Sequence, residues 1–125
     1  MICEQDQQQI RLIKNVLNNY KFKHIIPNKD GNVYKMILNQ KPAIIILNEK
    51  FQKNIGEELV NQIRNNPETN KIPILYISKD IDLNEKLKKY VNDSFVQLIN
   101  EPYRLKFFRH YISRWTTFRS LYVKQ

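Results

Sequence analysis

The longest uninterrupted apolar run in the chain is Ala43 to Leu47, five residues that lie between Pro42 and Asn48. Three of the five are β-branched, and such residues are typical of a strand buried on both faces of a parallel sheet. Pro42 stops the run at its start because proline has no N–H for the sheet ladder. In an open parallel sheet the carboxyl ends of the strands face the ligand crevice, so Asn48 is a candidate site residue. The pattern also fits a second interpretation, in which Asn48 only begins a loop.

Strand and helix patterns alternate along the rest of the chain. Short apolar runs predict strands at 1–3, 24–26, 43–47, 74–77 and 95–99. Apolar residues at helical spacing predict five helices. The first is capped by Asp6, the second is short and follows Gly31, and the third follows Gly56. The fourth runs from about Leu83 to Val91, and the last is long and covers about 104–122. Gly31 lies in a loop, where it is able to take a positive φ. This order predicts an α/β fold with three αβα layers: a five-stranded parallel sheet, a very short first strand, and two helices on one face with three on the other.

Composition indicates one soluble domain over residues 1–125. The chain is 42% hydrophobic and 26% charged, and its apolar runs are too short to span a bilayer. The first residues lack the basic region and apolar core of a secretory signal, and Cys3 is the only cysteine. We therefore expect a cytoplasmic protein, or one of an organelle stroma or matrix, with Cys3 packed as a small hydrophobe. The formal charge of +9 predicts an acidic partner, which is a protein, a nucleic acid or a membrane surface.

Three stretches carry a resemblance to a known family: NQKPAIIILN, GEELVNQIRNNPETNKIPILYIS and INEPY. The first is similar to the third strand, the second to the third helix, its turn and the fourth strand, and the last to the fifth-strand ending of response-regulator receiver domains of bacterial two-component systems. The match runs in register over about residues 2 to 117. It implies the flavodoxin-like or CheY-like (βα)5 fold, and a cis peptide bond between Glu101 and Pro102.

The same resemblance implies a degenerate pseudo-receiver. Asn48 stands at the position of the phosphoacceptor aspartate, and an amide oxygen is a feeble nucleophile toward phosphorus. The acidic pair of the family is Glu4 and Gln5 here, its hydroxyl is retained as Ser78, and its lysine is replaced by Glu101. We expect no enzyme activity, no cofactor and no resident metal. Two arrangements of the acids stay open: a weak metal ion between Glu4 and Glu101, or a bond between Glu101 and either Lys50 or a neighbouring amide.

The predicted last helix carries more aromatic residues than an outer helix of this fold needs. One stripe of Leu105, Phe108, Ile112 and Trp115 is enough to cover the sheet. The surplus aromatic and basic side chains predict a partner interface, although a solvated basic face also fits the pattern. His110 has no second ligand at suitable spacing, so it is not a metal site. The candidate binding residues are Tyr103, Arg104, Phe107, Arg109, Tyr111, Arg114, Phe118 and Tyr122.

Two classes of function follow. The first is a phosphorylation-independent regulatory module that docks a protein partner, or a second copy of itself, through its fourth helix, fifth strand and fifth helix. Tyr103 occupies the aromatic switch position of that face in the family that the chain resembles. The alternative is a basic nucleic-acid-associated regulatory protein that uses the receiver fold as a scaffold. The chain has no separate DNA-binding segment before its end at Gln125, which favours the first class.

Overall fold

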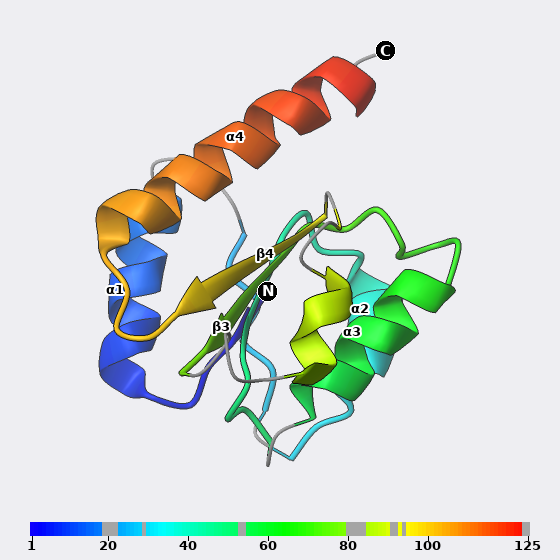
Figure 1. Ribbon diagram of the computed structural model, residues 1–125, viewed down its shortest axis with the longest axis horizontal. Helices are drawn as coiled ribbons and strands as arrows, with labels where there is room; N and C mark the ends of the chain where they lie inside the picture. Colours follow the sequence, from blue (N-terminus) through cyan, green and yellow to red (C-terminus); the bar gives the residue numbers. More distant parts are fainter. Residues whose placement is uncertain are drawn as a thin grey trace.

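The computed structural model describes residues 1–18, 23–28, 30–52, 55–79, 85–90, 93 and 95–123, with the backbone alone at 85–87, 107 and 116–123. Within these ranges the chain forms a four-stranded parallel sheet in the order β1-β2-β3-β4 (Figure 1). The strands are β1 (Ile2–Cys3), β2 (Ile45–Asn48), β3 (Ile74–Ser78) and β4 (Val96–Asn100). The prediction that the first strand is very short is therefore confirmed.

The prediction of a fifth strand at 24–26 is wrong. This segment runs beside β1, where the Ile2 N–H donates to the Ile25 carbonyl at 2.8 Å, but it does not form a strand. β1 has only two residues to offer a partner, and Pro27 has no N–H for a ladder. There is too little backbone on either side to build a regular strand pair, and among the described residues the sheet ends at β1.

Helices pack on both faces of the sheet. They are α1 (Gln7–Asn18), α2 (Val33–Gln40), α3 (Gly56–Asn65), the 3-10 helix η2 (Glu85–Tyr90) and α4 (Leu105–Val123). Asp6 caps α1 as expected, since its Oδ1 accepts from the Gln8 N–H at 2.9 Å. Within the described residues, the expected fourth helix corresponds to the 3-10 helix η2, and Leu83 and Val91 at its expected ends lie outside those residues.

Successive side chains along each strand point to opposite faces of the sheet, and they belong to two apolar clusters, one on each face. Ile2, Ile46 and Leu75 pack with the buried stripes of α1 and α4 on one face. Cys3, Leu47 and Tyr76 pack with α2, α3 and Tyr90 of η2 on the other face. Figure 1 shows the same division, with α1 and α4 on one side of the sheet and α2, α3 and η2 on the other. The predicted three-layer arrangement is thus present around a sheet of four strands.

The two glycines, Gly31 and Gly56, do not use their conformational freedom, since neither has a positive φ. Gly56, at the start of α3, is required for space: a Cβ there would lie 2.7 Å from the hydroxyl of Tyr76 and 2.9 Å from its ring. Among the described residues, the positive φ angles belong to Lys41, which ends α2 with φ 45°, and to Gln52, with φ 48°.

The last helix is longer than the sheet that it covers. Its C-terminal turns lie clear of the rest of the molecule in Figure 1. Among the described residues, no helix is both long and apolar enough to cross a membrane.

Candidate functional site

The candidate site lies where the parallel strands end. Glu4 follows β1, Asn48 is the last residue of β2, Ser78 the last of β3, and Glu101 follows β4. Because all four strands run in the same direction, their carboxyl ends meet at one edge of the sheet. The sheet therefore brings Glu4, Asn48, Ser78 and Glu101, which are far apart in the sequence, to the same edge.

Asn48 joins the two acids of the site through its side-chain amide. Its Nδ2 donates to Glu4 Oε1 and to Glu101 Oε1, both at 3.0 Å, and its Oδ1 accepts from the Lys50 N–H at 3.0 Å. Asn48 is buried, with 6% of its surface exposed, and Glu4 is buried beside it. This orientation of the amide is the one that pairs both N–H donors with acceptors, so the buried group is fully satisfied.

Glu4 is held by its own loop as well. Its second oxygen, Oε2, accepts from the Gln5 N–H at 2.9 Å and from the Asp6 N–H at 3.2 Å. The side chain of Gln5 lies outside this network, where its Oε1 accepts from the Gln52 N–H at 2.8 Å. Gln5 thus ties the loop after β2 to the end of β1, and only Glu4 of the expected pair faces Asn48.

The Ser78 side chain lies at the same edge of the sheet, but its hydroxyl is bound outside the network of Glu4, Asn48 and Glu101. Its hydroxyl donates to Glu49 Oε2 at 2.5 Å. Sequence reasoning missed Glu49, although its place directly after Asn48 and at the turn from β2 was an available signal. The retained hydroxyl is thereby engaged by a carboxylate of the adjacent turn.

Tyr103 links the site to the helical layer. It follows the cis peptide bond between Glu101 and Pro102, which was predicted and is confirmed. Its hydroxyl donates to Gln9 Oε1 of α1 at 2.8 Å, and its ring stacks on Phe108 of α4 with centroids 6.0 Å apart. Burial raises the pKa of Tyr103 to about 12, with a further contribution from the nearby Glu4 and Glu101 carboxylates. The hydroxyl therefore stays protonated and available as a donor.

These residues surround a cavity of about 230 Å³. Its lining consists of Glu4, Asp6, Gln9, Asn48, Lys50, Glu101, Pro102 and Tyr103. In the part of the chain that the structure describes, no group of three or more His, Cys, Asp or Glu residues is arranged to hold a metal ion. Mg²⁺ requires oxygen ligands directed at the ion, whereas here an N–H donor lies between the two carboxylates. The residues present do not fit a magnesium ion, and Glu101 pairs with a neighbouring amide, the second of the two arrangements left open.

The predicted core stripe of α4 is confirmed. Phe108, Ile112 and Trp115 are buried against the sheet, and Leu105 packs beside them. Arg104, Arg109 and Arg114 are exposed, and Tyr111 is half-buried against the same cluster. The side chains of Phe107, Phe118 and Tyr122 lie outside the described residues.

Comparisons with known proteins agree on the fold. No protein-family model and no curated protein matches the chain. Among solved structures, the phosphorylated cyanobacterial phytochrome response regulator RcpA matches with a TM-score of 0.62 and 22% identity, over 98% of this chain and 91% of that one. The response regulator RPA3017, in red light signaling of R. palustris, matches with a TM-score of 0.54 and 11% identity, over 95% of this chain and 90% of that one. The chain therefore has a CheY-like receiver fold, with four strands in the sheet that the described residues form.

Proposed function

We propose that this protein is a phosphorylation-independent, receiver-like regulatory module that acts by binding a partner. The observation that carries the proposal is the amide of Asn48, which donates to Glu4 and Glu101 at the place where a receiver has its phosphoacceptor carboxylate. The likeness to response regulators supports a signalling role, and the altered pocket supports the loss of its phosphorylation step.

The electrostatics of the site argue against phosphoryl transfer. A phosphoryl group that approached Asn48 would meet the carboxylates of Glu4 and Glu101, each 3.0 Å from the amide nitrogen. In place of a lysine that would neutralise the incoming charge, Glu101 adds a negative charge. Asn48 offers no carboxylate oxygen, and its amide oxygen already accepts the Lys50 N–H.

The docking face in this proposal consists of η2, β4 and α4, the elements that correspond to the fourth helix, fifth strand and fifth helix of the sequence prediction. Arg104, Arg109 and Arg114 are exposed on α4, and Arg side chains form charge-assisted bonds to carboxylates in a fixed geometry. The C-terminal turns of α4 extend clear of the body, where a partner can reach them (Figure 1). We infer an acidic protein, or a second copy of the chain, as the partner.

Phosphorylation is tested by incubating the protein with acetyl phosphate and Mg²⁺ and measuring its intact mass. We expect no phosphoryl adduct on the parent protein. The Ser78→Ala variant serves as a control, because the Ser78 hydroxyl lies at the same edge of the sheet and is an alternative position for an adduct. An adduct on the parent that maps to the strand ends around Asn48 would contradict the proposal.

The docking face is tested by replacing Tyr111, Phe118 and Tyr122 with alanine, singly and together. For Phe118→Ala and Tyr122→Ala, the proposal expects self-association or partner binding to be lost while the melting temperature changes little. Tyr111→Ala also removes packing against the cluster that contains Phe108 and Ile112, so its melting temperature should fall. A fall of several degrees for each single variant would instead assign these side chains to the core of the domain. A stable triple variant that retains every interaction of the parent would place the interface elsewhere.

A nucleic-acid role is the second candidate, and the charge distribution favours it. Six of the Lys and Arg residues lie between Arg104 and the C-terminus, and the same stretch contains no Asp or Glu. Binding to a phosphate backbone weakens steeply with salt because counterions are released. Measurable binding to duplex DNA or RNA, with a steep salt dependence that Arg109→Gln and Arg114→Gln reduce, would establish this role in place of the first.

A further inference from the structure

The fold separates acidic side chains from one whole layer of the molecule. α1 and α4 pack side by side on one face of the sheet (Figure 1), and neither helix contains an Asp or a Glu. In the described helices the acids are Glu57 and Glu58 of α3 and Glu85 of η2, which are elements of the other face. The layer of α1 and α4 therefore combines basic and uncharged residues from two segments that are far apart in the sequence.

The outward side chains of this layer form a basic surface. Arg11 of α1 is exposed and Lys14 is half-buried, while Lys106, Arg109 and Arg114 of α4 are exposed. These five residues are called the α1–α4 basic surface below. The other exposed side chains in the described part of the two helices are polar and carry no negative charge: Gln7, Gln8, Asn15, Asn18, His110 and Ser113.

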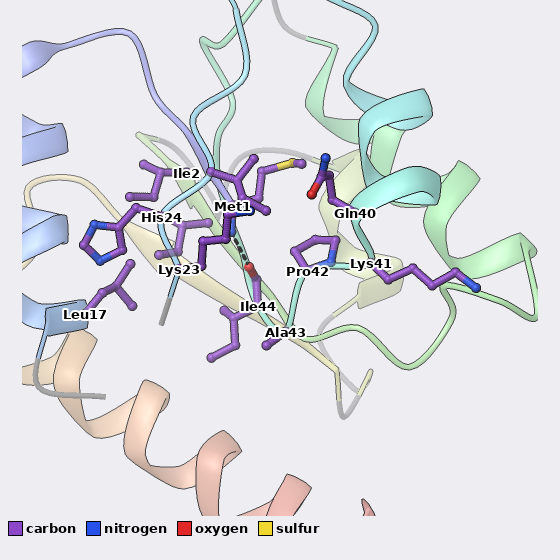
Figure 2. A pocket seen from close by; sticks show the side chains of 12 residues that line it. Met1, Ile2, Leu17, Lys23, His24, Gln40, Lys41, Pro42, Ala43 and Ile44 are labelled. Atoms are coloured by element: carbon purple, nitrogen blue, oxygen red, sulfur yellow. Dashed lines mark hydrogen bonds between the residues drawn. The ribbon is translucent and has the colours of Figure 1, made fainter. Parts of the chain in front are cut away.

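The surroundings of this surface differ at its two ends. Where α1 begins, Asp6 is exposed and caps the helix, so the acids of the candidate site border this end. Toward the end of α1, Lys23 and His24 lie beside Leu17 and line a pocket of about 310 Å³ where β1 and β2 begin (Figure 2). None of the residues that line this pocket is acidic, so the basic character continues to that end of the sheet.

The composition of the surface favours a nucleic-acid backbone over a membrane or a protein. In the described part of α1 and α4, the apolar side chains are buried or half-buried, and the exposed large hydrophobic residue of the described chain, Ile26, lies on neither helix. An interfacial helix inserts an apolar face among lipid head groups, and the centre of a protein interface is apolar and poor in lysine. Arg, Lys, Ser, Asn and Gln are by contrast the side chains that bind DNA phosphates.

The spacing of the bases fits a duplex. Lys106 and Arg114 are separated by about 12 Å along the axis of α4, at 1.5 Å per residue. The axes of packed helices lie about 8–10 Å apart, and the major groove of DNA is about 12 Å wide. Long side chains of α1 and α4 can therefore reach phosphates on the two sides of one groove. A single strand is usually held by stacking on aromatic rings, and no Phe, Tyr or Trp is exposed in the described part of the two helices.

We propose that the α1–α4 basic surface binds the phosphate backbone of double-stranded DNA without reading its sequence. The inference rests on the nucleic-acid role given above as the second candidate, and it adds α1 to the site. Arg11 and Lys14 neutralise phosphates on one side of a groove, and the bases of α4 neutralise phosphates on the other side. Because neither helix carries a carboxylate, no negative charge within them opposes the approach of the phosphates.

The test measures the affinity for a fluorescently labelled DNA duplex of mixed sequence by anisotropy, from about 50 to about 200 mM salt. Each neutralised phosphate contributes about −0.9 to the slope of log affinity against log salt concentration, so five contacts give a slope of about −4.5. The parent protein should therefore lose affinity by about 500-fold over this range. Absence of salt-dependent binding would overturn both the surface and the nucleic-acid role.

Paired charge removals locate the contacts. Arg11→Gln with Lys14→Gln on α1, and Arg109→Gln with Arg114→Gln on α4, each remove two contacts and should reduce the loss over the salt range to about 40-fold. The melting temperature of each variant shows whether it is folded. Should the α1 pair be unfolded, Arg11→Gln alone replaces it, with an expected loss of about 150-fold.

The control removes the same charge elsewhere. Lys35→Gln on α2 with Lys71→Gln in the turn before β3 changes two exposed lysines outside the surface and should keep the loss at about 500-fold. An effect of this control as large as that of the α1 and α4 pairs would overturn the proposal, because the net charge of the whole protein would then explain the binding.

Three further outcomes would overturn the proposal. An α1 pair with the slope of the parent would remove α1 from the site and leave the nucleic-acid role to α4 alone. Tighter binding to a single strand of the same sequence would indicate stacking in place of duplex contacts. Displacement of the duplex by vesicles of phosphatidylglycerol and phosphatidylcholine, but not by vesicles of phosphatidylcholine alone, would assign the surface to an anionic membrane. The phosphoryl adduct test is independent of all these measurements, so the two proposals can fail separately.

Discussion

Replacing Asn48 with aspartate tests how the amide holds the strand ends together. The substitution keeps the shape of the side chain but removes the two N–H donors that bind Glu4 and Glu101. Hydrogen bonds to charged acceptors each contribute about 1.5–3 kcal/mol. The variant also places a third carboxylate beside two others, 3.0 Å from each if the side chain does not move.

The repulsion between the carboxylates determines whether the aspartate side chain of the variant is charged or protonated. Two like charges 3.0 Å apart repel by about 5 kcal/mol at an effective dielectric constant of about 20. An ordinary carboxyl group has a pKa of about 4, which is about three units below pH 7. Each unit of difference between pH and pKa corresponds to about 1.4 kcal/mol, so keeping the proton on the group at about pH 7 costs about 4 kcal/mol. Because repulsion from two neighbours exceeds this cost, the folded variant takes up a proton. The loss of stability at about pH 7 is then about 4 kcal/mol for the proton and about a further 1.5–3 kcal/mol for the hydrogen bond that a single O–H cannot replace, which together lower the melting temperature by about 20 °C.

Proton uptake gives the variant a pH dependence that the parent lacks at this position. The folded variant binds one more proton than the unfolded chain between the ordinary carboxyl pKa and the raised pKa of the cluster, so its free energy of unfolding falls as pH rises. The difference from the parent should therefore shrink by about 1.4 kcal/mol for each pH unit below 7. Urea denaturation of both proteins at several pH values measures this difference.

Asn15→Asp is the matched control. Asn15 is exposed on α1, and the same chemical change there should alter stability by less than about 0.5 kcal/mol. The variant at Asn48 should also gain stability from millimolar Mg²⁺, because a cation relieves the repulsion among three carboxylates, whereas the parent should not. An Asn48→Asp protein as stable as the parent at every pH would refute the description of the amide as the clamp between Glu4 and Glu101.

Three further predictions concern the support of the site. Gly56→Ala should lower the free energy of unfolding, measured by urea denaturation, by about 1–3 kcal/mol, because the added methyl group meets the buried Tyr76 ring. Gly31→Ala, whose nearest contact would be 3.4 Å away, should leave the free energy of unfolding unchanged. Equal losses of stability in the two variants would contradict the argument that Gly56 is required for space. Arg64→Lys should lower the free energy of unfolding by about 2 kcal/mol or more, because the guanidinium donates to the carbonyls of Asn70, Ile72 and Phe95 and pairs with Asp93. Arg11→Lys, on the exposed face of α1, is the control and should leave the free energy of unfolding nearly unchanged. An Arg64→Lys protein as stable as the parent would show that these bonds are dispensable. Cys3 should react with iodoacetamide only when the domain unfolds, because burial raises the pKa of its thiol to about 12; rapid labelling of the native protein at mildly alkaline pH would disprove this.

Local patterns in the sequence were enough to predict most of the elements. The run 43–47 predicted a central strand, and the structure has β2 at Ile45–Asn48. The stripe of Phe108, Ile112 and Trp115 predicted the buried face of α4. These predictions succeed because burial imposes a period of about two on strands and about 3.6 on helices, and both periods can be read from neighbouring residues.

The edge strand could not be predicted in the same way. His24–Ile26 has the composition of a strand, but a strand also needs a partner long enough to pair with, and β1 offers only two residues. The identity of the residues near the site was predictable from the order of the strands, whereas their hydrogen bonds were not. The pairing of Ser78 with Glu49, 29 positions away, depends on how the turn after β2 folds over the end of β3.

The sequence by itself determined that strands and helices alternate, that Asn48 ends a central strand, and that no aspartate stands at that position. Only the tertiary structure decided that the Asn48 amide bridges Glu4 and Glu101, which lie 44 and 53 positions away. It also decided that a pocket lies at the opposite end of the sheet, where β1 and β2 begin. Propensity and periodicity act between neighbouring residues, whereas hydrogen bonds of side chains and the space between segments depend on strand register and packing, which are set only when distant segments come together.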